Sequence, residues 1–232
     1  MSELERWETR FASPDYVFGT EPNAFLKKQA PRFSRGQRAL ALADGEGRNG
    51  VWLAMQGLDV LSVDFSPKGL AKADALARTR GVVIRTERAD LSNWRWPENT
   101  FDVVVGIFMQ FAGPAIRDRI FAGIRRTLKP GGLVLIEGYR PEQLAYKTGG
   151  PKQVENLYTK PMLEKAFTGF EIIELRSYDG FMDEGTRHKG MSALIDLIAK
   201  KPTGERQQRG IPGLSFRVRG RRAPTPPADG TK

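Results

Sequence analysis

The sequence predicts an α/β fold in which helices cover both faces of a doubly wound, mostly parallel sheet of seven strands. Apolar runs alternate with helix patterns as far as residue 139, which is typical of parallel strands joined by helices. A Gly-x-Gly turn follows the first apolar run at once, and a single aspartate, Asp64, ends the second. No convincing helix separates the last two runs, so we expect a hairpin at one edge and an antiparallel last strand.

Each strand is predicted from a short apolar run with turn formers or polar residues around it. Val60 and Val63 give the second run a β-branched character, and the continuous run 103–105 is typical of a central strand covered on both faces. The expected strands are residues 38–43, 59–65, 82–85, 101–107, 133–139, 171–177 and 192–200. A polar loop is expected between the last two.

The helices are predicted from apolar spacing and from their start and stop signals. Ser66 is expected as an N-cap with Pro67 in the first turn, and Thr159 as the N-cap of a later helix. Residues 129–132 are predicted to stop a helix and turn the chain. The expected helices, besides a short one near the N-terminus, are residues 23–29, 49–56, 66–81, 114–128 and 159–167.

Length and composition predict one globular domain with extensions. The chain has 232 residues, of which 40% are hydrophobic, and no apolar run is long enough to span a membrane. We expect a lid segment at 1–36, the main domain at 37–200 and a basic, proline-containing tail at 201–232. Cysteine is absent, which excludes a disulfide framework, a thiolate nucleophile and a cysteine zinc site. The start of the chain lacks the apolar core of a signal peptide, so a cytoplasmic protein is expected.

The formal charge of +10 belongs largely to the tail. The segment 201–232 contains eight basic and two acidic residues, giving +6, so residues 1–200 carry +4. A nucleic-acid footprint spread over the main domain is therefore not indicated. Leu214, Phe216 and Val218 alternate with polar residues, which fits a short edge strand; a solubilising extension is the simpler interpretation of the tail.

The turn after the first strand and the aspartate after the second form a nucleotide-site pattern. Gly45 and Gly47 allow the backbone to approach a ligand closely, and the Asp64 carboxylate at the tip of the next strand is placed to accept bonds from ribose hydroxyls. Neither feature is specific alone, because an ordinary strand-to-helix turn also uses glycine. Together, at this spacing, they predict a nucleotide-containing ligand.

In the order of its motifs the chain resembles class I S-adenosylmethionine (SAM)-dependent methyltransferases, and more narrowly their tellurite-resistance and thiopurine-type small-molecule branch. The resemblance covers about residues 5–200. The motifs that carry it are 16–23 (YVFGTEPN), 45–49 (GEGRN), 63–66 (VDFS), 89–91 (ADL), 101–104 (FDVV), 128–132 (LKPGG) and 183–190 (DEGTRHKG). The first superfamily motif departs from its usual form, since Ala41 replaces an aspartate and Ala43 a glycine.

The resemblance implies SAM as the cofactor and a set of residues that hold it. Asp90 is expected near the adenine amine, Phe65 on the adenine or in the core, and Gly106 near the amino-acid end. Glu46 and Arg48 are expected either to orient that end or to pair with each other. The expected cofactor residues are Ala43, Gly45, Gly47, Asn49, Asp64, Phe65, Ala89, Asp90, Leu91 and Gly106.

Three residues are expected to act at the methyl acceptor. His188, the single histidine, is expected in the polar loop before the last strand as a base or, with Arg187, as an anchor for an anionic substrate. Tyr16 belongs to the expected lid, which would exclude water and align the nucleophile. A lone loop histidine without a role, and an aromatic cluster that only staples the N-terminus to the core, are the plain alternatives. A metal site is not expected.

The resemblance therefore implies methyl transfer from SAM to a small, soft nucleophile such as a thiol, sulfide or other chalcogen compound. Nucleic acid is not an expected partner. Two rival hypotheses are kept: a methyltransferase that grips RNA or another macromolecule through the basic tail, and a SAM-binding regulator without turnover. Loss of activity on deletion of residues 203–232 would favour the first rival, and absence of turnover with every acceptor the second.

Overall fold

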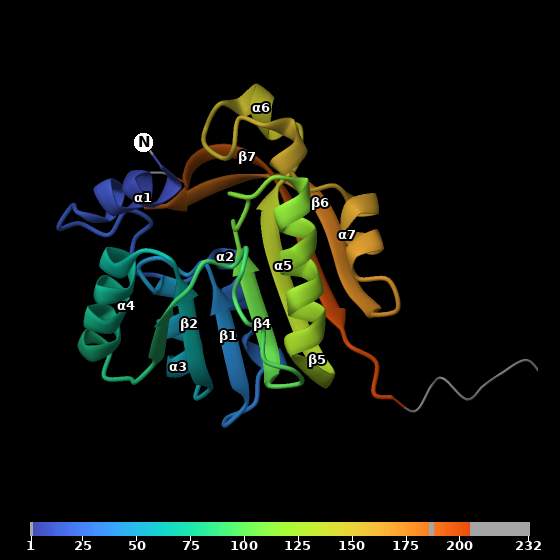
Figure 1. Ribbon diagram of the computed structural model, residues 1–232. Coiled ribbons are helices and arrows are strands. Elements are labelled where there is room, and N and C mark those ends of the chain that lie inside the picture. The colour runs from blue at the N-terminus through green and yellow to red at the C-terminus, as the bar shows by residue number, and fades with distance from the viewer. Residues whose placement is uncertain (1, 186–187, 205–232) are drawn as a thin grey trace, which may run out of the picture.

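The computed structural model describes residues 2–185 and 188–204, which form a seven-stranded sheet with helices on both faces (Figure 1). The strand order is β3-β2-β1-β4-β5-β7-β6. The strands are β1 (Arg38–Leu42), β2 (Asp59–Asp64), β3 (Arg85–Arg88), β4 (Phe101–Ile107), β5 (Leu128–Tyr139), β6 (Glu171–Glu184) and β7 (His188–Lys200). The first five pair in parallel, and β7 runs antiparallel to both neighbours. The predicted fold class is confirmed.

The helices divide between the two faces of the sheet according to side-chain alternation in the central strands. The helices are α1 (Glu3–Phe11), α2 (Ala24–Lys28), α3 (Arg48–Met55), α4 (Pro67–Thr79), α5 (Pro114–Thr127), α6 (Gln143–Tyr146) and α7 (Lys160–Ala166), with 3-10 turns at Ala30–Arg32 and Val154–Asn156. Val104 of β4 packs with residues of α5 and α7, whereas Val103 and Val105 pack with residues of α2, α3 and α4. The apolar run predicted for a central strand therefore serves two cores.

The predicted caps are confirmed. The Ser66 side chain accepts a hydrogen bond from the Gly69 amide at the start of α4, and the Thr159 side chain accepts one from the Met162 amide at the start of α7. Asn23 caps α2 in the same way through the Leu26 amide. These caps satisfy amides that the helices leave unpaired and fix where each helix begins.

The third strand was predicted too early. The predicted range 82–85 contains an apolar run, but β3 begins at Arg85 and pairs with β2 from Leu61 to Asp64. Ile84 is buried under α4, while the preceding Val83 is 88% exposed. The apolar run therefore contains a side chain that packs beneath α4 and is not a strand. The strand that follows it is polar and lies at the edge of the sheet.

The polar loop predicted between the last two strands is also wrong. Strand β6 continues to Glu184 and β7 begins at His188, so the two form a long antiparallel ribbon. Its polar composition reflects a ribbon that extends past the sheet, toward α1 and α6 at the top of Figure 1, with both faces partly open to solvent.

The turn predicted at 129–132 lies inside β5. This strand starts at Leu128, and its pairing with β4 shifts register between Phe101 and Val103. Gly131 takes a φ of +79°, and Gly131 and Gly132 exchange backbone hydrogen bonds with Lys201. The glycines therefore allow an irregularity in the strand. The predicted tail lies beyond the last described residue, apart from 201–204.

Candidate functional site

The glycine turn between β1 and α3 has the strained backbone that close approach to a ligand requires. Ala43, Gly45 and Gly47 have φ values of +48°, +54° and +86°. A Cβ on Gly47 would overlap Ala73 of α4, and one on Gly45 would lie 3.1 Å from the Phe11 ring of α1. Ala43 thus adopts the left-handed conformation despite its methyl group, and the turn survives the loss of its first glycine.

Asp64 ties the glycine turn to the start of α4. One carboxylate oxygen accepts from the Gly45 amide at 2.9 Å and the other from the Ser66 amide at 2.9 Å. The residue is buried, and this burial raises the pKa of its carboxyl group above the usual value. A carboxylate has about four acceptor positions, and the Ser66, Gly45 and Phe65 amides engage three of them, which leaves about one for a ribose hydroxyl. The ribose role of Asp64 remains a prediction.

The other expected cofactor residues lie around the same strand ends. The Ala89 amide donates to the Asp64 carbonyl, Leu91 is buried in the core, and the exposed Asp90 carboxylate accepts from the Ser92 amide at 2.8 Å. Phe65 is partly buried. Gly106 lies opposite Leu42 in the sheet, where a Cβ would clash with Met109. The structure gathers these residues at one edge, as predicted; which of them contact a cofactor stays a prediction.

The residues between α1 and α2, which belong to the expected lid, are held over the glycine turn by Glu46. Its buried carboxylate accepts from the Val17 amide at 2.8 Å and pairs with Lys72 of α4 at 2.6 Å. The Tyr16 hydroxyl donates to the Lys72 carbonyl at 3.1 Å, and the Lys72 ammonium lies over the Tyr16 ring. These contacts give Tyr16 a place in anchoring the lid to α4, and a contact with the methyl acceptor remains a proposal.

Asn49 also holds the lid, because its side-chain oxygen accepts from the Asn23 amide at 3.0 Å. The Asn23 side chain donates to Glu137 of β5 and, at 3.2 Å, to Glu184 of β6. Glu184 in turn forms an ion pair with Arg48 at 2.7 Å. The alternative that Glu46 and Arg48 pair with each other is therefore wrong, since each has a different partner. The lid, α3 and the hairpin meet at this network.

His188 stands in a box of aromatic rings formed by three separate segments. Its ring centroid lies 4.5 Å from that of Phe108, 4.6 Å from that of Phe18 and 6.0 Å from that of Tyr139. Its Nδ1 atom is buried and has no hydrogen-bond partner among the described residues. Burial, with a smaller contribution from the Arg48 charge, lowers the pKa of His188 to about 3, so the ring is uncharged at neutral pH.

Arg187, the other expected acceptor residue, lies outside the described residues. The expectation that His188 belongs to a loop is corrected, because it opens β7 opposite Glu184. Phe108, which closes the box next to β4, has a φ of +53°. A strained residue between the end of β4 and the histidine is a common feature of functional sites.

Sequence reasoning missed the carboxyl pair below this network. Glu137 of β5 and Asp196 of β7 lie opposite each other in the sheet, and the Tyr178 hydroxyl is 3.2 Å from the former and 3.5 Å from the latter. Burial raises the pKa of both carboxyl groups, that of Asp196 to about 6, and repulsion from Asp196 adds to the rise at Glu137. The available signal was one acidic residue in each of two otherwise apolar strands.

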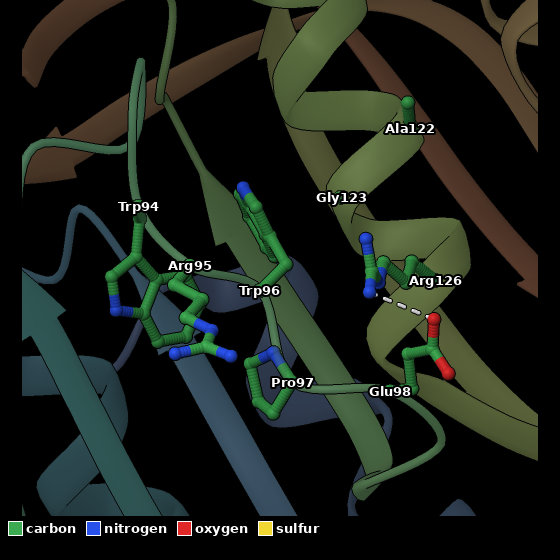
Figure 2. Close-up of a pocket in the computed structure, with 8 residues that line it drawn as sticks. All are labelled: Trp94, Arg95, Trp96, Pro97, Glu98, Ala122, Gly123 and Arg126. Carbon is green, nitrogen blue, oxygen red and sulfur yellow. Dashed lines mark ion pairs between the residues drawn. The ribbon is translucent and has the colours of Figure 1, made fainter.

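A separate open depression of about 690 Å³ lies away from these strand ends (Figure 2). Trp94, Trp96 and Pro97 line it on one side and the second half of α5 on the other, with an ion pair of 2.8 Å between Glu98 and Arg126. None of the expected site residues lines it. Elsewhere in residues 2–185 and 188–204, no group of three metal-ligating side chains is placed to hold an ion, and no helix is long and apolar enough to cross a membrane.

Comparison with known proteins assigns part of the chain to a known kind of domain. Residues 39–132 match the family model described as a methyltransferase domain. Residues 39–132 form a SAM-dependent methyltransferase domain. An uncharacterized methyltransferase of Synechocystis is 29% identical to the chain over 63% of the chain and 73% of the relative. A glycine/sarcosine N-methyltransferase of Halorhodospira halochloris is 30% identical over 58% of the chain, which spans only 48% of that relative.

Solved structures resemble this methyltransferase fold over most of the described chain. One concerns the conversion of a disulfide bond into a thioacetal group during echinomycin biosynthesis, with a TM-score of 0.71, 15% identity and coverage of 88% and 94% of the two chains. The N-methyltransferase NodS of Bradyrhizobium japonicum with S-adenosylhomocysteine has a TM-score of 0.68, 13% identity and coverage of 86% and 98%. TehB of Haemophilus influenzae has a TM-score of 0.64, 16% identity and coverage of 85% of this chain and 66% of its own. At sequence identities this low, the similarity is one of fold alone.

The residues at the strand ends fit the SAM cofactor of this methyltransferase domain. A turn with three positive φ values, next to the buried Asp64 carboxylate, offers both a close backbone approach and a hydroxyl acceptor of the kind that a nucleoside needs. The uncharged His188 and its aromatic neighbours lie next to Phe108, just past the end of β4. The candidate site thus has a polar, nucleoside-compatible half and an apolar half.

Proposed function

We propose that the protein transfers a methyl group from SAM to a small, soft nucleophile, a thiol, sulfide or other chalcogen compound. The observation that carries this proposal is the unpartnered Nδ1 atom of His188 inside the box of Phe18, Phe108 and Tyr139. An apolar box favours an acceptor that is weakly hydrated, and sulfur and its heavier neighbours lose less hydration on entry than an ammonium or an alkoxide.

The chain's own residues supply binding, orientation and exclusion of water. Bound SAM brings a methyl group on a positively charged sulfur. In the tautomer with the proton on Nε2, the unpartnered Nδ1 atom accepts a hydrogen bond from the acceptor S–H and points the acceptor sulfur toward the cofactor half of the site. The new bond between carbon and acceptor forms as the old carbon–sulfur bond breaks, and the acceptor proton leaves to solvent, so that the products are the methylated acceptor and S-adenosylhomocysteine.

The electrostatics of the box favour a hydrogen-bond role for His188 over the anchoring of an anion. A histidine whose pKa is lowered to about 3 carries no charge at pH 7, and Arg48 nearby is already paired with Glu184. The solved structure concerned with conversion of a disulfide bond into a thioacetal group shares this fold, so the fold is compatible with an acceptor at sulfur. The relatives that methylate glycine and sarcosine support an amine acceptor instead, so the test includes both.

The experiment measures release of S-adenosylhomocysteine from SAM by the purified full chain. Sulfide, small alkyl thiols, a thiopurine, selenite, tellurite and iodide are tested separately, beside glycine and sarcosine. Turnover with one of the soft acceptors is expected. Turnover confined to the amines would overturn the choice of acceptor, and binding of SAM without turnover on any acceptor would favour the regulator.

A pair of variants tests the part played by the box. His188→Asn is expected to lower kcat by about a hundredfold with an unchanged dissociation constant for SAM, because only acceptor alignment is lost. Phe181→Ser is the matched control, since Phe181 lies on the same hairpin with 68% of its surface exposed. Equal kcat values for the two variants would remove His188 from the mechanism.

A further inference from the structure

The glycine turn lacks the acidic residue that the resembled motif has at position 41, yet a carboxylate still reaches the inside of the turn. Ala41 is a buried strand residue with 1% of its surface exposed. Three residues later, Asp44 directs its side chain back toward β2 and α3. Its Oδ2 atom accepts from the Ser62 hydroxyl at 2.8 Å and from the Gly50 amide at 3.1 Å.

These two bonds connect three elements that shape the cofactor loop. Ser62 belongs to β2 and is fully buried, Gly50 lies in the first turn of α3, and Asp44 lies in the turn itself. Helix α3 has Gly47 at its N-cap and so has no capping side chain of its own. Asp44 provides the missing acceptor for a first-turn amide, and a carboxylate at this end also interacts favourably with the helix dipole.

The geometry around Gly50 shows that positions 41 and 44 border the same space. A Cβ on Gly50 would overlap the Oδ2 atom of Asp44 and would lie 3.5 Å from the Cβ of Ala41. The Asp44 carboxyl group therefore stands next to the small side chain at position 41, where a longer side chain would place its own carboxyl group.

We propose that Asp44 is the positioning residue of the cofactor loop, and that its carboxyl group takes the place of the one absent from position 41. Asp44 acts through the backbone: it fixes the conformation of residues 43–47, and these residues bind the cofactor. Burial raises the pKa of Asp44 to about 7, and the bonds from Ser62 and Gly50 oppose the rise. The inference rests on the proposed function only in taking SAM as the ligand.

The test moves the carboxylate between the two positions. Asp44→Ala removes both bonds and is expected to weaken SAM binding by about tenfold to a hundredfold, with the KM of the acceptor unchanged. Ala41→Asp alone places two carboxyl groups in one buried space and is expected to lower the melting temperature. The double variant Ala41→Asp/Asp44→Ala is expected to bind SAM better than Asp44→Ala does, which a general loss of stability cannot produce.

Two further variants keep the result interpretable. Asp44→Asn retains an oxygen that accepts from Ser62 and Gly50, so it is expected to keep most of the SAM affinity even where Asp44→Ala folds poorly. Asp102→Asn is the control, because Asp102 holds Lys129 at the opposite end of the sheet, at 2.9 Å; it is expected to lower stability and leave SAM affinity unchanged.

A double variant that binds SAM no better than Asp44→Ala would overturn the proposal, as would an unchanged SAM affinity in Asp44→Ala. Calorimetric titration with SAM measures these affinities without any acceptor. A wild-type chain that binds SAM but methylates nothing would therefore refute the proposed function while leaving the role of Asp44 open to the same test.

Discussion

Arg48 and Glu184 form an ion pair of 2.7 Å that joins the two halves of the site. Arg48 begins α3 directly after the glycine turn, and Glu184 ends β6 next to the histidine. Their side chains are only 7% and 12% exposed, so each charge depends on the other for compensation. The pair connects the cofactor loop to the hairpin that carries His188.

Removal of one partner of this pair is expected to destabilise the protein strongly. Glu184→Gln leaves the Arg48 charge buried without a counterion, which costs about 3 kcal/mol of unfolding free energy. The double variant Arg48→Met/Glu184→Gln is expected to cost less than the sum of the single variants. Urea denaturation measures both. Glu98→Gln is the control, since that pair is exposed and is worth less than about 1 kcal/mol; additive costs at Arg48 and Glu184 would show that the pair is not coupled.

Replacement of Asp64 is expected to weaken cofactor binding. Asp64→Ala removes the acceptor for the Gly45 amide and the proposed acceptor for ribose hydroxyls, so the dissociation constant for SAM should rise about tenfold to a hundredfold. Asp59→Ala is the matched control, because Asp59 begins the same strand at its other end and its side chain is half exposed. An unchanged dissociation constant for SAM in Asp64→Ala would contradict the ribose role.

The features predicted from sequence are those encoded within one short segment. The glycine turn, Asp64 and the caps Ser66 and Thr159 each depend on neighbours a few residues away, and the structure has each in place. The mostly parallel, doubly wound sheet followed from the alternation of apolar runs with helices, whereas the strand order is known only from the structure. The edge strand β3 was misplaced because Ile84 is buried by α4, a contact that no local pattern distinguishes from a strand interior.

The aromatic box around His188 could not be predicted as a unit, because it is assembled from distant segments. Phe18, Phe108, Tyr139 and His188 meet only when the lid, β4, β5 and the hairpin are in place. The same holds for Glu137 and Asp196, which are lone acidic residues until the antiparallel register sets them opposite each other. The hydrogen bonds that Asp44 accepts from Ser62 and Gly50 likewise depend on how β2 and α3 pack.

Acid is expected to destabilise the wild type more than a variant without His188. The folded-state pKa of His188 is about 3, below the value of about 6.5 in the unfolded chain. Between these values the unfolded chain binds the proton and the folded chain does not, so the unfolding free energy falls as pH falls from about 6.5 toward 3. This group contributes up to about 1.4 kcal/mol per pH unit.

The direction of this pH dependence is tested against the variant His188→Gln, which has no titrating group at position 188. Denaturant unfolding of both proteins at several pH values isolates the histidine, because Asp44 and Asp196 have raised pKa values and act in the opposite sense in both. The difference in unfolding free energy, wild type minus variant, should decrease steadily below about pH 6.5. A constant difference would mean that the ring titrates normally and is not buried as the structure shows.

Ala43→Gly is expected to stabilise the protein, which tests whether the turn is strained by the departure from the usual motif. Ala43 has a φ of +48°, a conformation that costs an L-residue about 1–2 kcal/mol and glycine almost nothing. The greater freedom of glycine in the unfolded chain offsets about 0.5–1 kcal/mol of this relief, so a net gain in unfolding free energy of up to about 1.5 kcal/mol is expected. Ala41→Gly is the control, because Ala41 is a buried residue of β1 and its substitution should only lower stability. Urea denaturation of the two variants decides the matter: equal losses would show that the turn accepts alanine without strain, and a gain at position 43 alone would locate the strain in the cofactor loop.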